Sequence, residues 1–171
     1  VQAYRLIGYE NRALQNEDFN NDQKDAGELG SGHTVTALYE IIPVGVKSTF
    51  FSIDELKYQQ TNIQPQAYNS SELMTVKLRY KLPDGDTSML IIHPVNDTRI
   101  AIEKTTNSFR WAAAVAGFGM LLRESAYANG YTLNDVITLA QGARGTDVEG
   151  YRSEFINLAK SYSAIAGEGI N

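Results

Sequence analysis

The segment that sets the architecture of this chain is 4–40, YRLIGYENRALQNEDFNNDQKDAGELGSGHTVTALYE. Its two ends, Tyr4–Glu10 and His33–Glu40, have the β-branched and aromatic content of strands. Between them, residues 11–32 are rich in Asn, Asp and Gly, a composition typical of a loop. We therefore predict two strands joined by a long acidic loop. The second strand is expected to continue to Val44, with Pro43 ending its pairing.

A β-hairpin is predicted at Glu72–His93. The first strand, Glu72–Leu82, alternates apolar and polar residues, so one face is expected to meet the core through Met74, Val76, Leu78, Tyr80 and Leu82. Pro83-Asp84-Gly85-Asp86 supplies the turn, because Asp-Gly accepts the positive φ of tight hairpins. The return strand, Thr87–His93, is expected to end at Pro94. A further short strand at Ser48–Ile53 is an interpretation of a segment that otherwise has loop composition.

After Pro94 the apolar residues recur at helical spacing, and three helices are expected. The first covers Phe109–Leu122, with Thr106 or Ser108 as N-cap and with Gly117 and Gly119 permitting close approach of a neighbour. Its apolar run is too short to span a bilayer, which needs about 20 residues. The other two begin at the capping-box patterns Thr132–Asp135 and Thr146–Glu149.

Strands early in the chain and helices late favour the α+β class. We predict an antiparallel β-sandwich-like N-terminal part with a C-terminal helical annex of about three helices. Residues 1–171 are expected to form one domain, with mainly strands and loops over 1–95 and mainly helices over 96–166. Val1 lies inside a strand pattern, and the first residues lack the basic and apolar regions of a signal peptide. We therefore expect the chain to be part of a longer protein, with any signal peptide or lipid anchor upstream of Val1.

Composition excludes several classes of function. The formal net charge of −5 is spread along the chain without a basic stripe, which argues against nucleic acid as a partner. Cysteine is absent, so disulfides and thiolate metal sites are excluded. No membrane contact by this chain itself is expected.

The acidic loop contains one candidate metal motif. Asp18-Phe-Asn20-Asn-Asp22 has the alternating spacing that lets side-chain oxygens converge on Ca²⁺. The sixth and twelfth positions of an EF-hand loop are filled here by Gln23 and Leu29 instead of Gly and Glu. A looser calcium site would use Asp18, Asn20, Asp22, Asp25 and Glu28. The alternative is a solvated loop whose Asn and Asp side chains hydrogen-bond their own backbone.

No converging catalytic set is evident. The two histidines, His33 and His93, stand at strand ends without a Ser/His/Asp pattern around them. Glu10 and Glu40 could form a carboxylate pair, although surface ion pairs with Arg5, Arg12 or Arg79 are the commoner outcome. We therefore expect a protein that is not an enzyme and has no cofactor. A hydrolase using Glu10, Glu40 or His33 remains an alternative.

Several blocks of the sequence resemble a known family. They are Tyr4–Arg12, Asp18–Asp22, Asp25–Glu28 and Gly32–Glu40, followed later by Val76–Lys81, Leu121–Arg123 and Gly150–Phe155. The chain is similar to the uncharacterised C-terminal domain that follows the von Willebrand factor type A module in bacterial YfbK-type proteins. The metal-binding D-x-S-x-S motif of that module is absent here, so its metal site does not carry over.

The resemblance implies an accessory, protein-interaction role beside a type A module of the same chain. It also implies a place in the bacterial cell envelope, where some members are lipoproteins. Exposed residues that could contact a partner are Tyr9, Glu10, Arg12, His33 and Tyr39. If the domain docks against its neighbour, it is expected to expose an unusually apolar patch.

Overall fold

The structure of the chain is a computed structural model that describes residues 1–8, 15–24, 27–47, 70–128 and 130–166. It contains two compact units. The first comprises Val1–Val35 and Tyr39–Arg99, and the second comprises Thr36–Leu38 and Ile100–Asn171. The predicted strand at Ser48–Ile53 lies outside the described residues.

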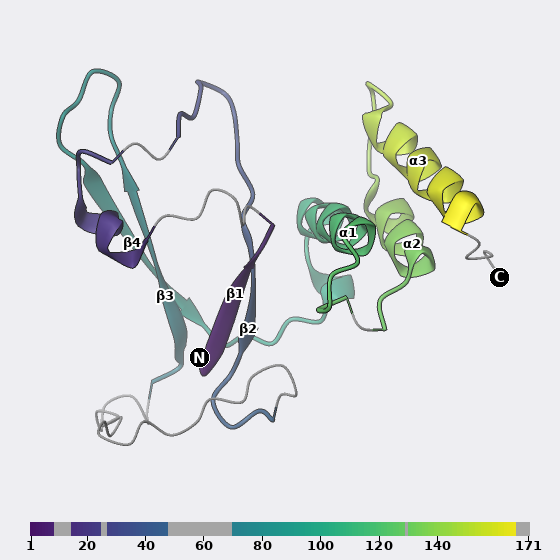
Figure 1. Cartoon of the computed structure of the whole chain (residues 1–171), viewed down its shortest axis with the longest axis horizontal. Coiled ribbons are helices and arrows are strands. Elements are labelled where there is room, and N and C mark those ends of the chain that lie inside the picture. Colours follow the sequence, from purple (N-terminus) through teal and green to yellow (C-terminus); the bar gives the residue numbers. More distant parts are fainter. Residues whose placement is uncertain (9–14, 25–26, 48–69, 129, 167–171) are drawn as a thin grey trace. The chain divides into compact units, whose positions relative to one another are not determined.

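The α+β class is confirmed. The first unit contains two sheets of two strands each, β1 (Ala3–Ile7) with β2 (Leu38–Ile42) and β3 (Glu72–Tyr80) with β4 (Met89–Asn96). A 3₁₀ turn, η2 (Asn16–Asn20), follows β1 and precedes β2 along the chain, and it lies beside the β3–β4 hairpin (Figure 1). Antiparallel pairing of β1 with β2 is visible in two contacts. Gln2 N donates to Ile42 O over 2.7 Å, and Arg5 Nη2 lies 2.6 Å from Glu40 Oε2.

The second predicted strand begins later than expected. Residues His33–Ala37 are not in a strand, and β2 starts only at Leu38. Thr34, Val35 and Thr36 have strand propensity, but propensity becomes a strand only where a neighbouring strand supplies hydrogen bonds. A turn precedes them instead: Gly32 has a φ of 79°, and His33 N donates to Gly30 O over 3.1 Å.

The β3–β4 hairpin has the predicted turn. Asp84 adopts a φ of 61°, and Gly85 N donates to Leu82 O over 3.0 Å. The prediction that Pro94 ends the return strand is wrong, because β4 continues to Asn96 and Pro94 lies opposite Thr75. Among the described residues β4 pairs only with β3. A proline, which lacks the N–H donor, is tolerated in such an edge strand.

The predicted burial of β3 holds for only half of the strand. Met74 and Val76 are partly buried, whereas Leu78, Tyr80 and Leu82 are exposed. The pairs Leu78–Ile91 and Tyr80–Met89 place these side chains beside the exposed side chains of β4. In a sandwich the inner face would be buried along its whole length. The structure therefore shows two small sheets, and the sandwich stays a prediction.

The second unit contains the three predicted helices, α1 (Asn107–Leu122), α2 (Leu133–Ala143) and α3 (Tyr151–Ala166), preceded by a 3₁₀ turn, η4 (Ile102–Lys104). The N-cap of α1 is Thr106, whose Oγ1 accepts from Phe109 N over 3.2 Å. The capping box of α2 is present as predicted. Asp135 N donates to Thr132 Oγ1 over 3.2 Å, and Thr132 N donates to the Asp135 carboxylate over 2.8 Å.

The third helix is capped differently from the prediction. Thr146–Glu149 does not form a capping box. Instead, the Asp147 carboxylate accepts hydrogen bonds from Arg152 N over 3.1 Å and from Ser153 N over 2.7 Å. An aspartate before a helix can accept hydrogen bonds from the first free N–H groups as well as a threonine can. The local sequence therefore did not show whether Thr146 or Asp147 would cap α3.

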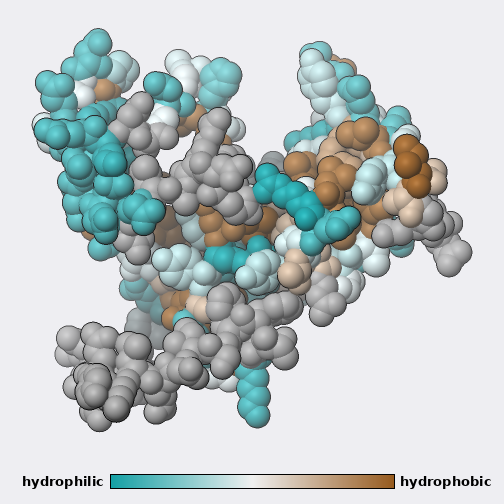
Figure 2. Space-filling view, viewed as in Figure 1, coloured by the Kyte–Doolittle hydropathy of each residue, from teal (hydrophilic) through white to brown (hydrophobic). Residues whose placement is uncertain are grey.

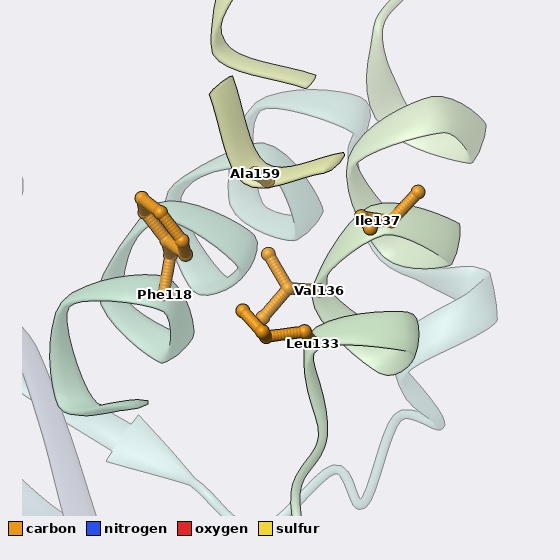
Figure 3. Packing of buried hydrophobic residues seen from close by; sticks show 5 residues of the cluster. All are labelled: Phe118, Leu133, Val136, Ile137 and Ala159. Carbon is orange, nitrogen blue, oxygen red and sulfur yellow. The ribbon is translucent and has the colours of Figure 1, made fainter. Parts of the chain in front are cut away.

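The core of the helical unit lies between the three helices (Figure 3). It is formed by Phe118, Leu133, Val136, Ile137 and Ala159. The Phe118 ring meets the rings of Phe155 and Tyr162 edge-on, with centroids 5.5 Å and 5.9 Å away. A second buried group contains Ala114, Ala140 and Ile156. The small side chains of Ala114 and Ala140 let α1 and α2 approach closely.

One of the two predicted glycine contacts of α1 is present. A side chain at Gly117 would lie 2.4 Å from Tyr131 Cε1, so only glycine admits this ring. Gly119 was predicted to have the same role, but no atom lies within 4 Å of its missing side chain. Within the described part of the chain, no helix is long and apolar enough to cross a membrane.

Candidate functional site: the two faces of the β3–β4 hairpin

The acidic loop between β1 and β2 is anchored to one face of the hairpin by Asp22. Ser88 binds its carboxylate twice, with a short hydrogen bond from Oγ to Oδ1 and one of 3.4 Å from the backbone N to Oδ2. Arg79 Nη1 lies 3.4 Å from Asp22 Oδ1 and donates to Ser88 Oγ over 2.7 Å. Lys81 Nζ donates to the backbone carbonyl of Asp22. We call the hairpin side that carries Arg79, Lys81 and Ser88 the polar face.

The electrostatics of this anchor favour a charged Asp22. The side-chain hydrogen bond from Ser88 lowers the pKa of Asp22 most, and the backbone N–H of Ser88 lowers it further. Partial burial opposes them, and the Arg79 and Lys81 charges add to the lowering. The Arg79 guanidinium also lies 5.8 Å from the Phe19 ring centroid, a cation–π contact that ties η2 to the hairpin. The loop is thus held by charge-assisted contacts.

Two of the five calcium candidates, Asp22 and Asp18, contact other residues of the chain. Asp22 is bound to the hairpin, Asp18 lies 3.5 Å from Lys24 Nζ, Asn20 ends η2, and Glu28 is exposed. Asp25 lies outside the described residues. The part of the chain that the structure describes contains no group of three or more His, Cys, Asp or Glu placed to hold a metal ion. The side chain of Asn21 accepts from Gln23 N over 3.0 Å, the backbone-directed bonding expected of the solvated-loop alternative.

The residues considered for hydrolysis serve other contacts. Glu40 forms the ion pair with Arg5, the outcome expected for a surface carboxylate. His33 is exposed and lies beside Gly30, whereas His93 is exposed within β4 and pairs with Val76. Glu10 lies outside the described residues. Among the described candidates, Glu40 lies in β2 and His93 in β4, whereas His33 lies outside any helix or strand.

The interaction candidates are only partly described. Tyr9, Glu10 and Arg12 lie outside the described residues. Tyr39 is exposed on β2, and its ring centroid lies 6.5 Å from that of Tyr4 on β1. Tyr39 and His33, which is also exposed, stay predicted contact residues.

The opposite face of the hairpin is apolar and open. Cross-strand pairing puts Leu78 beside Ile91 and Tyr80 beside Met89. These four side chains, which we call the apolar patch, expose between 39% and 56% of their surface. No acidic or basic side chain lies among them. An exposed apolar patch of this kind is a candidate site for another macromolecule.

The sequence analysis predicted that Leu78 and Tyr80 would face the core, and it did not identify Met89 and Ile91 as surface residues. The signal was the run Met89-Leu90-Ile91-Ile92, which is apolar at every position. A strand with one wet face alternates, whereas a continuous run is typical of a strand covered on both faces. In the structure both Leu90 and Ile92 on the polar face and Met89 and Ile91 on the other remain exposed. The hydrophobic residues of the helical unit also reach the surface in the view of Figure 2.

Comparison with known proteins places the chain in a family. Residues 1–165 match the family model described as "Uncharacterized protein YfbK, C-terminal". The "Uncharacterized protein YfbK" of Escherichia coli (strain K12) is 41% identical over 158 residues, which are 92% of this chain and 26% of that protein. The chain thus spans about a quarter of this relative. No solved structure matches it. This chain belongs to the family of YfbK C-terminal domains.

Proposed function

We propose that this chain is a non-enzymatic interaction domain that docks onto a von Willebrand factor type A module of the same polypeptide. The observation that supports the proposal is the apolar patch on the hairpin, where four large apolar side chains are open to solvent. The candidate partner comes from the resemblance of the sequence to domains that follow a type A module. The match to only 26% of a longer relative is consistent with such a neighbour.

The energetics suit a tethered partner. Complete burial of one Leu, Ile or Met side chain contributes roughly 1.5–3 kcal/mol. The patch residues are about half exposed, so covering all four contributes on the order of 4 kcal/mol. Association of two free proteins costs about that much or more in lost translational and rotational freedom. A module on the same polypeptide has already lost most of that freedom, and the patch then suffices.

The non-enzymatic part of the proposal is supported by the dispersal of the polar candidates. Glu40 is neutralised by Arg5, and the Asp22 carboxylate is occupied by Ser88 and Arg79. The family resemblance also supports a location in the bacterial envelope, as part of the same proposal. Cell fractionation with an antibody against this chain would test that location.

The test of docking is an NMR titration of the isotope-labelled chain with the type A module, produced separately from the same gene. We expect saturable shifts that include amides of β3 and β4. Millimolar dissociation constants count as binding, because tethering supplies effective concentrations of about that size. Absence of any shift at millimolar module would refute the proposed function.

A further inference from the structure

We infer that the docked module lies flat on the apolar patch and does not pair as a strand added beside β4. This inference deepens the proposed function and rests on it. It specifies which of three surfaces of the hairpin is used: the apolar face, the polar face, or the unpaired edge of β4.

The polar face is already occupied near the turn. Arg79, Lys81 and Ser88 all contact Asp22, and Phe19 lies under the Arg79 guanidinium. A partner on this side would have to displace a set of charge-assisted hydrogen bonds that this chain makes with itself. At the same end of the hairpin, the apolar patch on the other face requires no such displacement.

The edge of β4 is poorly suited to strand addition. Pro94 lies inside β4 and has no N–H to offer a neighbouring strand. The register of β3 shifts between Glu72 and Met74, so the ladder is irregular at the same end of the hairpin. Prolines and bulges are the devices by which edge strands avoid pairing with other chains. Main-chain pairing with β4 is therefore disfavoured, which favours side-chain contact with a face.

The size of the patch identifies the kind of partner. A stable interface between free proteins uses about 20–30 residues on each side. The apolar patch contributes four, which is too few for a separate protein or a second copy but adequate for a tethered module. About three quarters of the YfbK relative lies outside the match, so a polypeptide of that kind can carry such a module. The patch has no charged side chain, so the facing surface is expected to be apolar as well.

The experiment compares this chain alone with the full-length protein encoded by its gene, using hydroxyl-radical footprinting and amide hydrogen exchange. In the full-length protein we expect modification of Leu78, Met89 and Ile91 to fall several-fold. Leu90 and Ile92, on the polar face of the same strand, serve as internal controls and should react equally in both samples. Amide exchange along β4 should show no new protected edge.

Matched variants of the full-length protein provide a second readout. Ile91→Lys places a charge in the apolar patch, whereas Ile92→Lys places it on the polar face of the same strand. Both side chains are exposed, so neither change disturbs a buried core. We expect Ile91→Lys to undock the domain, seen as a larger radius of gyration in X-ray scattering, and Ile92→Lys to leave the radius unchanged.

The outcomes separate the inference from the proposed function. The inference would be overturned if Leu90 and Ile92, or the β4 edge amides, were protected instead of the patch. Docking itself would then still be supported. Protection of no part of the hairpin, with equal radii for both variants and the unmodified protein, would refute docking as well. Protection of the patch with a selective effect of Ile91→Lys would support both.

Discussion

The contact between Gly117 and Tyr131 leads to a quantitative prediction. A Cβ atom at position 117 would lie 2.4 Å from Cε1, 3.1 Å from Cζ and 3.2 Å from Oη of the Tyr131 ring. The first distance is far below van der Waals contact, so Gly117→Ala requires the ring to move. Tyr131 is half-buried and its ring packs against the core cluster that contains Phe118 and Val136, which limits that movement.

Two opposing effects set the magnitude. Alanine is favoured over glycine in a helix interior by about 1 kcal/mol. Overpacking of a buried site costs roughly 1–3 kcal/mol. Gly119→Ala in the same helix gains the first effect without the second, because nothing lies within 4 Å of that position. We therefore expect Gly117→Ala to be less stable than Gly119→Ala by about 1–3 kcal/mol, the overpacking cost alone.

The assay is urea unfolding of both variants and the unmodified chain, followed by circular dichroism. Gly119→Ala should raise the midpoint, and Gly117→Ala should lower it or leave it near the unmodified value. Tyr131→Leu removes the ring atoms in question, so Gly117→Ala in that background should lose most of its cost. Equal stabilisation by both alanines, or a Gly117→Ala effect that Tyr131→Leu does not change, would refute the packing argument.

Three further predictions concern the loop, a helix end and calcium. Asp22→Asn should speed proteolysis of the loop at neutral pH. Because the pKa of Asp22 is lowered in the folded protein, the charged carboxylate stabilises the loop above about pH 4, and this stabilisation is lost as the pH falls through the folded-state pKa. The proteolysis rates of the variant and the unmodified chain should therefore converge in acid. A difference in rate that does not change with pH would contradict this. Glu124 lies two residues after the end of α1 and has a φ of 51°, a conformation that favours glycine. Glu124→Gly should therefore stabilise the chain by about 1 kcal/mol in thermal melts; a loss of stability would show that the Glu124 side chain makes a needed contact. Ca²⁺ should leave the melting midpoint unchanged relative to chelator, because Asp22 and Asp18 already contact Ser88 and Lys24; a rise would establish a metal site.

The features that sequence predicted well depend on neighbouring residues. The Asp84–Gly85 turn, the Thr106 N-cap and the Thr132–Asp135 capping box each involve groups no more than three residues apart. Their geometry is set by local backbone preferences, which can be predicted from the residue types alone. The same locality explains the error before α3, where Thr146 and Asp147 were equally good caps and only the path of the chain selected Asp147.

The candidate site could be predicted only in outline. The acidic loop was visible as a composition, but the role of Asp22 depends on Ser88, which lies 66 residues further along the chain. Likewise, the alternation of apolar and polar residues in β3 predicted an apolar face but did not indicate which element would cover it. Leu78 and Met74 have the same local pattern, yet one is exposed and the other partly buried, since burial is decided by what packs above each residue.

By itself, the sequence determined the family, the α+β class, the hairpin and the three helices, because turn chemistry, caps and apolar periodicity act over a few residues. Tertiary structure alone decided three other features: where β2 begins, how Asp22 is used, and which face of the hairpin is left open. Each of these depends on contacts between residues far apart in the chain, and no local preference can specify them.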